Sequence, residues 1–190
     1  MEFFYHWSIL ILWVCFGGYW AYSGLQSRQT QRAEARTSRL THLGLVVLAI
    51  VLIGFGGFGI GLLTRRILPQ SGTVQIIGIA IAALGLLFAV WARVHLGPNW
   101  SGTITIKTDH DLIRTGPYAL VRHPIYTGLL VGIVGTAIVS GELRGVLAVI
   151  LIFIAYFRKI HIEETWLVGQ FGTEYSEYQK EVRALIPFLV

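Results

Sequence analysis

Long apolar runs separated by polar segments dominate the chain. Three of them, residues 3–25, 43–63 and 74–92, each match the roughly 20 residues that a helix needs to cross a bilayer. No basic stretch precedes the first run, and its aromatic residues continue to its end, so we interpret it as a span and not as a cleaved signal peptide. The pattern predicts three membrane-spanning helices in the first half of the chain.

Two shorter apolar runs follow, residues 127–139 and 145–157, and only residues 140–144 separate them. A helix of this length is about 20 Å long, so each run crosses a bilayer only if its helix extends into the flanking residues. A re-entrant pair is the alternative. In either case the two runs predict a helical hairpin whose ends open on the same side of the membrane.

Apolar residues also recur at near-helical spacing in the tail, at Phe171, Tyr175, Tyr178 and Val182. They predict an amphipathic helix that lies on the membrane or packs over the preceding loop. No linker or repeat divides the chain. We therefore expect an all-α, polytopic transmembrane protein of about five membrane helices in a single domain, residues 1–190, with three spans in residues 1–92 and the catalytic half in residues 93–190.

Composition and charge agree with a membrane protein. The chain is 54% hydrophobic and only 13% charged. Twelve of its Lys and Arg residues lie in residues 26–42, in residues 93–126 and after residue 157, and three lie in the remaining connections. The positive-inside rule places the middle loop and the tail in the cytoplasm and the N-terminus outside, and we expect an inner cell membrane. Because the cations fall between apolar runs, the net charge of +5 does not indicate nucleic-acid binding.

The first chemically suggestive motif is Arg122-His123-Pro124 at the end of the middle loop. Pro124 suits the first position of the helix that enters the hairpin. A helix start carries unpaired N–H groups and a partial positive charge, so with Arg122 it suits a carboxylate or phosphate. Tyr126 is expected on the same face as Arg122 and His123. For the motif alone, a simple interfacial anchor is the commoner explanation.

The second motif follows the hairpin and contains Lys159, His161, Glu163 and Glu164. If the helix continues beyond the apolar run, Lys159 and Glu163 lie one turn apart at the membrane surface. Adjacent carboxylates are usually a solvated helix face. Here both ends of one hairpin open on the same side, so the sequence predicts that a cationic and an anionic cluster face each other.

Other motifs point away from metal and dinucleotide chemistry. The histidines show neither the H-x-x-x-H nor the H-E-x-x-H spacing, so we predict no bound metal. The glycines of residues 54–61 lie inside an apolar run with no strand before them, and we expect them to serve close helix packing.

The last hundred residues resemble the isoprenylcysteine carboxyl methyltransferase family and its phospholipid methyltransferase relatives. The shared motifs occur in the family's order: Leu96-Gly97-Pro98-Asn99-Trp100, residues 110–113 with Gly116 and Tyr118, residues 122–128, Glu163-Glu164, and Phe171-Gly172 with Glu174, Tyr175 and Tyr178. Residues 1–90 match the family only as hydrophobic helices.

The resemblance implies methyl transfer from S-adenosylmethionine to a lipophilic small molecule or lipid, either the carboxylate of a prenylcysteine-like compound or a lipid amine. It places the cofactor carboxylate near Arg122 and His123, and the cofactor ammonium near Glu163. The implied cofactor-binding residues are Thr105, His110, Asp111, Leu112, Ile113, Gly116, Tyr118, Arg122, His123, Pro124, Tyr126 and Glu163, of which Leu112, Ile113 and Tyr118 contact the adenosine. The implied catalytic residues are Arg122, Lys159, Glu163 and Glu164.

Two features leave the acceptor open. Lys159 stands where the family commonly has arginine, and lysine cannot make the planar two-point contact of arginine with a carboxylate. A carboxylate acceptor needs no general base, whereas an amine acceptor must lose a proton, for which Glu164 and His161 are candidates.

Two other functions compete with methyl transfer. A membrane reductase that uses NADPH on a sterol-like substrate shares the Gly-x6-His-Pro-x-Tyr pattern of residues 116–126, but a 2′-phosphate would require more cations than Arg114 and Arg122. A non-catalytic scaffold or a transporter is the other alternative. A transporter would be expected to carry polar or broken segments at mid-membrane depth, which the three long runs lack.

Overall fold

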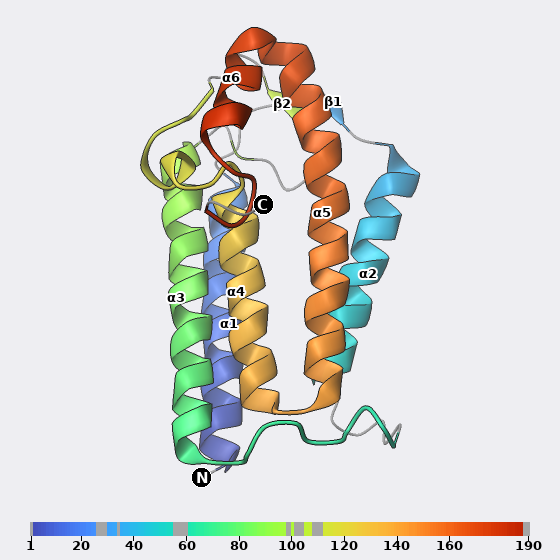
Figure 1. The fold of residues 1–190 in the computed structure, drawn as a ribbon, viewed down its shortest axis with the longest axis vertical. Helices are drawn as coiled ribbons and strands as arrows, with labels where there is room; N and C mark the ends of the chain where they lie inside the picture. Colours follow the sequence, from blue (N-terminus) through green and yellow to red (C-terminus); the bar gives the residue numbers. More distant parts are fainter. Residues whose placement is uncertain are drawn as a thin grey trace.

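In the described residues of the computed structural model, the long helices run side by side and a shorter one folds over one end of the bundle (Figure 1). The structure describes residues 2–25, 30–33, 35–54, 61–97, 100, 105–107 and 112–187. The elements are α1 (Glu2–Gly24), β1 (Thr30–Ala33), α2 (Arg36–Gly54), α3 (Gly72–Leu96), β2 (Thr105–Lys107), the 3-10 turn η2 (Gly116–Ala119), α4 (Pro124–Ser140), α5 (Leu143–Phe171) and α6 (Thr173–Glu181).

Three helices in the described part of the chain, α2, α3 and α5, are long and apolar enough to cross a membrane, and α4 is a shorter apolar helix. The 23-residue helix α1 packs beside α3. The predicted all-α, membrane-integral fold is confirmed. Large aliphatic and aromatic side chains such as Ile11, Leu48 and Leu87 point outward on these helices, as expected for helices surrounded by lipid.

The second helix is displaced from its predicted range. The hydropathy pattern predicted a span over residues 43–63, whereas α2 covers Arg36–Gly54. The polar residues before Leu43 are part of the helix, and residues 61–63, which the pattern included in the span, form a turn. A Cβ added at Gly54 or at Gly61 would meet no atom within 4 Å, so close packing is absent at these two positions; residues 55–60 lie outside the described residues.

The predicted hairpin is present, and both of its helices are longer than their apolar runs. Helix α4 has 17 residues and α5 has 29, which correspond to about 25 Å and 43 Å. Gly141 ends α4 in the left-handed conformation, with φ of 66°. The start of α4 and the last turns of α5 lie at the same end of the bundle as α6, opposite the N-terminus (Figure 1).

The packing of α4 on α3 depends on glycines from both helices. A Cβ on Gly85 of α3 would lie 2.6 Å from the Gly128 carbonyl oxygen, and a Cβ on Gly128 would lie 2.5 Å from the Gly85 carbonyl oxygen. Because both side chains are absent, the two backbones approach closely. This contact fixes where α4 begins, and so where Arg122 and His123 are placed.

Two features complete the end of the bundle that carries α6. Strands β1 and β2 form an antiparallel pair, with Thr30 opposite Lys107 and Ala33 opposite Thr105. They were not predicted, because so short a polar segment shows no alternation of apolar and polar residues. Helix α6 is the predicted amphipathic helix: Tyr175 and Tyr178 are buried, and the Tyr178 hydroxyl donates to the Tyr118 carbonyl in the middle loop.

Candidate functional site

The start of α4 meets the C-terminal segment of the chain, residues 178–187. Pro124 is the first residue of α4, as predicted, and His123 is its N-cap residue. The backbone N–H of Arg122 donates to the Arg183 carbonyl at 2.8 Å, and that of His123 donates to the Ala184 carbonyl at 2.9 Å. The C-terminal segment thus takes up two of the backbone donors that sequence analysis assigned to a ligand.

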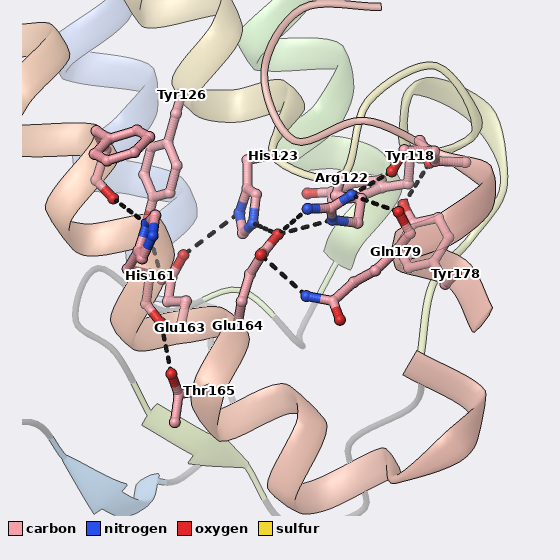
Figure 2. A network of polar contacts seen from close by, with 12 residues as sticks. Tyr118, Arg122, His123, Tyr126, His161, Glu163, Glu164, Thr165, Tyr178 and Gln179 are labelled. Atoms are coloured by element: carbon pink, nitrogen blue, oxygen red, sulfur yellow. Dashed lines mark hydrogen bonds and ion pairs between the residues drawn. The ribbon is translucent and has the colours of Figure 1, made fainter. Parts of the chain in front are cut away.

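Arg122 and Glu164 form the central ion pair of the site (Figure 2). Arg122 Nε donates to Glu164 Oε1 at 2.7 Å, and Arg122 Nη2 lies 2.5 Å from the same oxygen. Arg122 Nη1 also donates to the carbonyls of Gln179 and Val182. Only 9% of the Arg122 side chain and 18% of the Glu164 side chain are exposed. Most of the five donors of Arg122 are therefore engaged within the protein.

His123 lies between the two adjacent carboxylates. Its Nε2 is 3.1 Å from Glu164 Oε1, and its Nδ1 is 3.6 Å from Glu163 Oε2. The remaining oxygen of Glu164, Oε2, accepts a hydrogen bond of 3.0 Å from Gln179 Nε2. Glu164 is thus held by a guanidinium, an imidazole and an amide at once.

Glu163 faces a stack of aromatic rings. The Tyr126 hydroxyl donates to Glu163 Oε1 at 2.8 Å, and the Tyr126 ring stacks on His123 at 5.7 Å and on Tyr156 at 5.0 Å between ring centroids. Lys159 Nζ lies 5.4 Å from the centre of the Tyr126 ring, and 7% of this residue is exposed. The two clusters predicted from sequence therefore meet in one site, as Figure 2 shows for its acidic and basic members.

A second layer of the site is built around Tyr118. This side chain is buried against Ala92 and Ile125, and Ile113 packs on the same cluster. The Tyr178 hydroxyl donates to the Tyr118 carbonyl at 2.5 Å. Burial raises the pKa of Tyr178 to about 12, so this group is a neutral donor at physiological pH.

His95 supports the turn that carries Tyr118. Its Nε2 is 2.8 Å from Thr115 Oγ1, and its ring stacks on Tyr118 at 6.4 Å. Gly116 has φ of 59°, and a Cβ at this position would lie 2.7 Å from His95 Cε1. Only glycine satisfies both the backbone conformation and the space beside His95.

Most of the predicted site residues lie together. The described members gather at the mouth of the hairpin or in the adjoining layer: Ile113, Gly116, Tyr118, Arg122, His123, Pro124, Tyr126, Lys159, Glu163 and Glu164. Leu112 directly precedes Ile113 in the same loop. His110 and Asp111 lie outside the described residues, and Thr105 lies in β2 with its side chain outside the description.

Three site residues, Gln179, Tyr156 and His95, were not predicted from the sequence. Gln179 is one of many polar residues on a surface helix, and no spacing distinguishes it. Tyr156 lies inside an apolar run, where the pattern predicts a residue of the hydrophobic core. His161, proposed as a base, is exposed, and its Nδ1 is 3.3 Å from the Phe157 carbonyl oxygen.

A cavity of about 230 Å³ opens between α5 and the C-terminal segment. One part of its wall is apolar and the other is charged; the wall consists of Arg122, Phe157, Ile160, His161, Glu164, Gln179, Arg183, Ala184 and Leu185. Such a wall suits an amphipathic group. No cluster of three or more His, Cys, Asp or Glu side chains that could hold a metal occurs within the described ranges.

Fold and site together define a polytopic helical membrane protein with a buried arginine–carboxylate cluster at the mouth of a hairpin. The sequence profile of phospholipid methyltransferases matches residues 73–174, which run from α3 into α6. The chain belongs to the phospholipid methyltransferase family. The family resemblance found in the sequence is thereby confirmed.

Named relatives show the same relationship. The chain is 33% identical over 118 residues to the protein-S-isoprenylcysteine O-methyltransferase of Schizosaccharomyces pombe, covering 60% of this chain and 50% of that protein. It is 34% identical over 125 residues to a probable enzyme of the same name from Oryza sativa subsp. indica, covering 64% of this chain and 65% of that protein. The chain thus spans one half to two thirds of the length of these relatives.

A solved structure is also similar. The structure of the eukaryotic intramembrane Ras methyltransferase ICMT (isoprenylcysteine carboxyl methyltransferase) superposes with a TM-score of 0.57 at 25% sequence identity. The match covers 84% of this chain and 55% of that one. The similarity therefore extends into the N-terminal helices, where the sequence resembles the family only in hydropathy.

Proposed function

We propose that this protein transfers a methyl group from S-adenosylmethionine to a lipophilic acceptor at the membrane surface. The observation that carries the proposal is the meeting of Arg122 and His123, from the start of α4, with Glu163 and Glu164, from the end of α5. The names of the relatives, protein-S-isoprenylcysteine O-methyltransferases, support the same reaction class.

The residues present suit the charges of this cofactor. Glu164 is neutralised by Arg122, so the remaining negative charge of the cluster belongs to Glu163, which suits the cofactor ammonium. Most N–H donors of Arg122 already have partners within the protein, so Arg122 cannot form a two-point hydrogen-bonded contact with the cofactor carboxylate. Its contribution to binding that carboxylate is its positive charge. The apolar surface near Tyr118 and Ile113, with Leu112 beside it, suits an adenine ring.

When bound, S-adenosylmethionine supplies an already activated methyl group, so the protein needs mainly to orient the reactants and exclude water. Tyr126, Tyr156 and the aliphatic stem of Lys159 provide a buried wall next to Glu163. The Lys159 ammonium is the cation we assign to the acceptor.

The ion pairing of Glu164 and the charge of Lys159 favour a carboxylate acceptor over an amine. Glu164 is ion-paired with Arg122 and hydrogen-bonded to Gln179, which makes it a weak proton acceptor. His161 lines the cavity together with Glu164 and is also exposed to solvent. A prenylcysteine-like carboxylate reacts without either group, and the Lys159 ammonium suits its charge.

The catalytic half, residues 93–190, is proposed to face the cytoplasm within a single domain that has its N-terminus outside. The middle loop and the tail lie at one end of the bundle and the N-terminus at the other (Figure 1). Twelve of the fifteen Lys and Arg residues fall on the proposed cytoplasmic side. The inner cell membrane stays a prediction from sequence.

The decisive experiment incubates the purified protein with methyl-labelled S-adenosylmethionine and a membrane lipid extract. We expect the label in a lipid product that releases methanol under mild base, as a methyl ester does. Label that is stable to base would mean an amine acceptor. Calorimetry that shows binding of NADPH and not of S-adenosylmethionine would instead establish a reductase and overturn the proposal.

A further inference from the structure

The C-terminal segment, residues 178–187, docks on the site mainly through its backbone. Five of its carbonyl oxygens, those of residue 179 and residues 182–185, accept hydrogen bonds from the Arg122 guanidinium, from the backbone N–H groups of Arg122 and His123 and from the Thr127 hydroxyl. A backbone contact of this kind places little demand on the side chains of the segment. A side chain of the segment that contacts Glu163 or Glu164 is therefore a candidate for a role in the site.

Gln179 is such a side chain. Its Nε2 donates to Glu164 Oε2 at 3.0 Å, while its backbone carbonyl accepts a hydrogen bond of 3.2 Å from Arg122 Nη1. Gln179 therefore touches both members of the central ion pair, as Figure 2 shows. The reaction proposed above assigns it no role.

The amide of Gln179 is one of three side-chain groups that contact the Glu164 carboxylate. Arg122 and His123 both contact Oε1 of Glu164, and Gln179 contacts Oε2, so the orientation of this carboxylate is fixed. His123 also lies 3.6 Å from Glu163. If Glu164 lost its third partner, it could turn, and His123 could shift its hydrogen bond toward Glu163.

We propose that Gln179 is a positioning residue that holds Glu164 on Arg122 and His123 and so leaves the charge of Glu163 for a ligand ammonium. This inference rests on the proposed function, because it concerns the ammonium of the cofactor. It predicts that Gln179 affects recognition of that one group and not of the whole cofactor.

The test uses the full chain in lipid nanodiscs and calorimetry with two probes. One is S-adenosylhomocysteine, and the other is the same compound without its α-amino group. We expect the unsubstituted protein to prefer the amino compound by about tenfold, as for a charge-assisted hydrogen bond. Gln179→Met should reduce this preference to about twofold and leave the affinity for the deamino compound unchanged.

Gln170→Leu is the matched control. Gln170 also follows the hairpin, and its buried Oε1 has no hydrogen-bond partner within the described residues. This variant should keep the full tenfold preference. Gln179→Leu serves as a second variant if the methionine variant does not fold.

The outcomes separate the two proposals. If the unsubstituted protein binds neither probe, or if Glu163→Gln keeps the preference for the amino compound, the proposed cofactor site is wrong. If Glu163→Gln abolishes the preference and both Gln179 variants retain it, the role of Gln179 is wrong. Equal weakening of both probes by the Gln179 variants would show a purely structural contact and would also overturn the inference.

Discussion

Arg122 and Glu164 are separated by 42 residues in the chain, yet Arg122 Nε donates to Glu164 Oε1 at 2.7 Å. This pair joins the start of α4 to the end of α5, and Arg122 extends the junction to the C-terminal segment through the carbonyls of Gln179 and Val182. Three parts of the chain therefore depend on one guanidinium. Its replacement should affect the docking of the C-terminal segment as well as any ligand.

Arg122→Lys keeps the charge but loses the planar fork. Because a lysine ammonium cannot reach Glu164 and two carbonyls together, we expect a loss of about 2 kcal/mol in the free energy of unfolding. Limited proteolysis should also cut the C-terminal segment faster. The matched control is Arg114→Lys, whose partner Glu181 is 63% exposed and which should cost less than about 1 kcal/mol. Equal effects of the two substitutions would contradict the central role of Arg122.

Tyr126→Phe removes the hydroxyl that donates to Glu163 and keeps the ring stacked between His123 and Tyr156. We expect about a tenfold to hundredfold weaker affinity for S-adenosylmethionine, the range for loss of a hydrogen bond to a charged group. Tyr156→Phe changes the neighbouring ring of the same stack and should stay within twofold. Calorimetry of the two variants measures the difference in affinity. A larger loss of affinity in Tyr156→Phe than in Tyr126→Phe would mean that Tyr156, and not Tyr126, supports cofactor binding.

Lys159→Met tests the cation that we assign to the acceptor. The side chain keeps its length and packing against Tyr126 but loses its charge. We expect the KM for a carboxylate acceptor to rise at least about tenfold, as for a lost charge-assisted hydrogen bond, while the affinity for S-adenosylmethionine stays within twofold.

The control for Lys159 is its neighbour in the chain. Arg158 contacts the backbone carbonyl and hydroxyl of Ser38 in α2, so Arg158→Met should leave the acceptor KM unchanged. A weaker binding of S-adenosylmethionine in Lys159→Met, with an unchanged acceptor KM, would move Lys159 to the cofactor.

Gly85→Ala tests the close contact between α3 and α4. The new Cβ would lie 2.6 Å from the Gly128 carbonyl oxygen, so the helices must separate, and we expect a loss of stability of about 1–3 kcal/mol. Gly17→Ala in α1 is the control because a Cβ there meets nothing within 4 Å. Thermal unfolding in the same lipid measures both; a stable Gly85→Ala variant would argue against this packing.

Much of the fold was predictable because the bilayer imposes simple length and hydropathy rules on each helix. The hairpin, the emergence of α5 beyond its apolar run and the amphipathic helix α6 were all predicted and are confirmed. The range of α2 was wrong, because hydropathy does not register the polar first turns of a helix or distinguish an apolar turn, such as residues 61–63, from an apolar helix.

The parts of the site that depend on the order and spacing of residues along the chain were predictable. Pro124 at a helix start and Lys159 one turn from Glu163 follow from local spacing, and the hairpin brings the two motifs to one side. The sequence alone therefore determined a membrane-embedded helical protein with facing cationic and anionic clusters.

How those charges are paired depends on the packing of distant segments, which the sequence pattern does not reveal. The sequence pattern predicted that Arg122 binds a ligand. In the structure, Arg122 instead contacts Glu164 and the backbone of the C-terminal segment. Gln179 becomes a hydrogen-bond partner because of the position in which α6 packs. The spacing of apolar and polar residues does not predict that position. Helix formation depends on residues that are close in sequence. A buried charge needs a partner of opposite charge or a hydrogen bond, and here those partners come from segments that are distant in sequence.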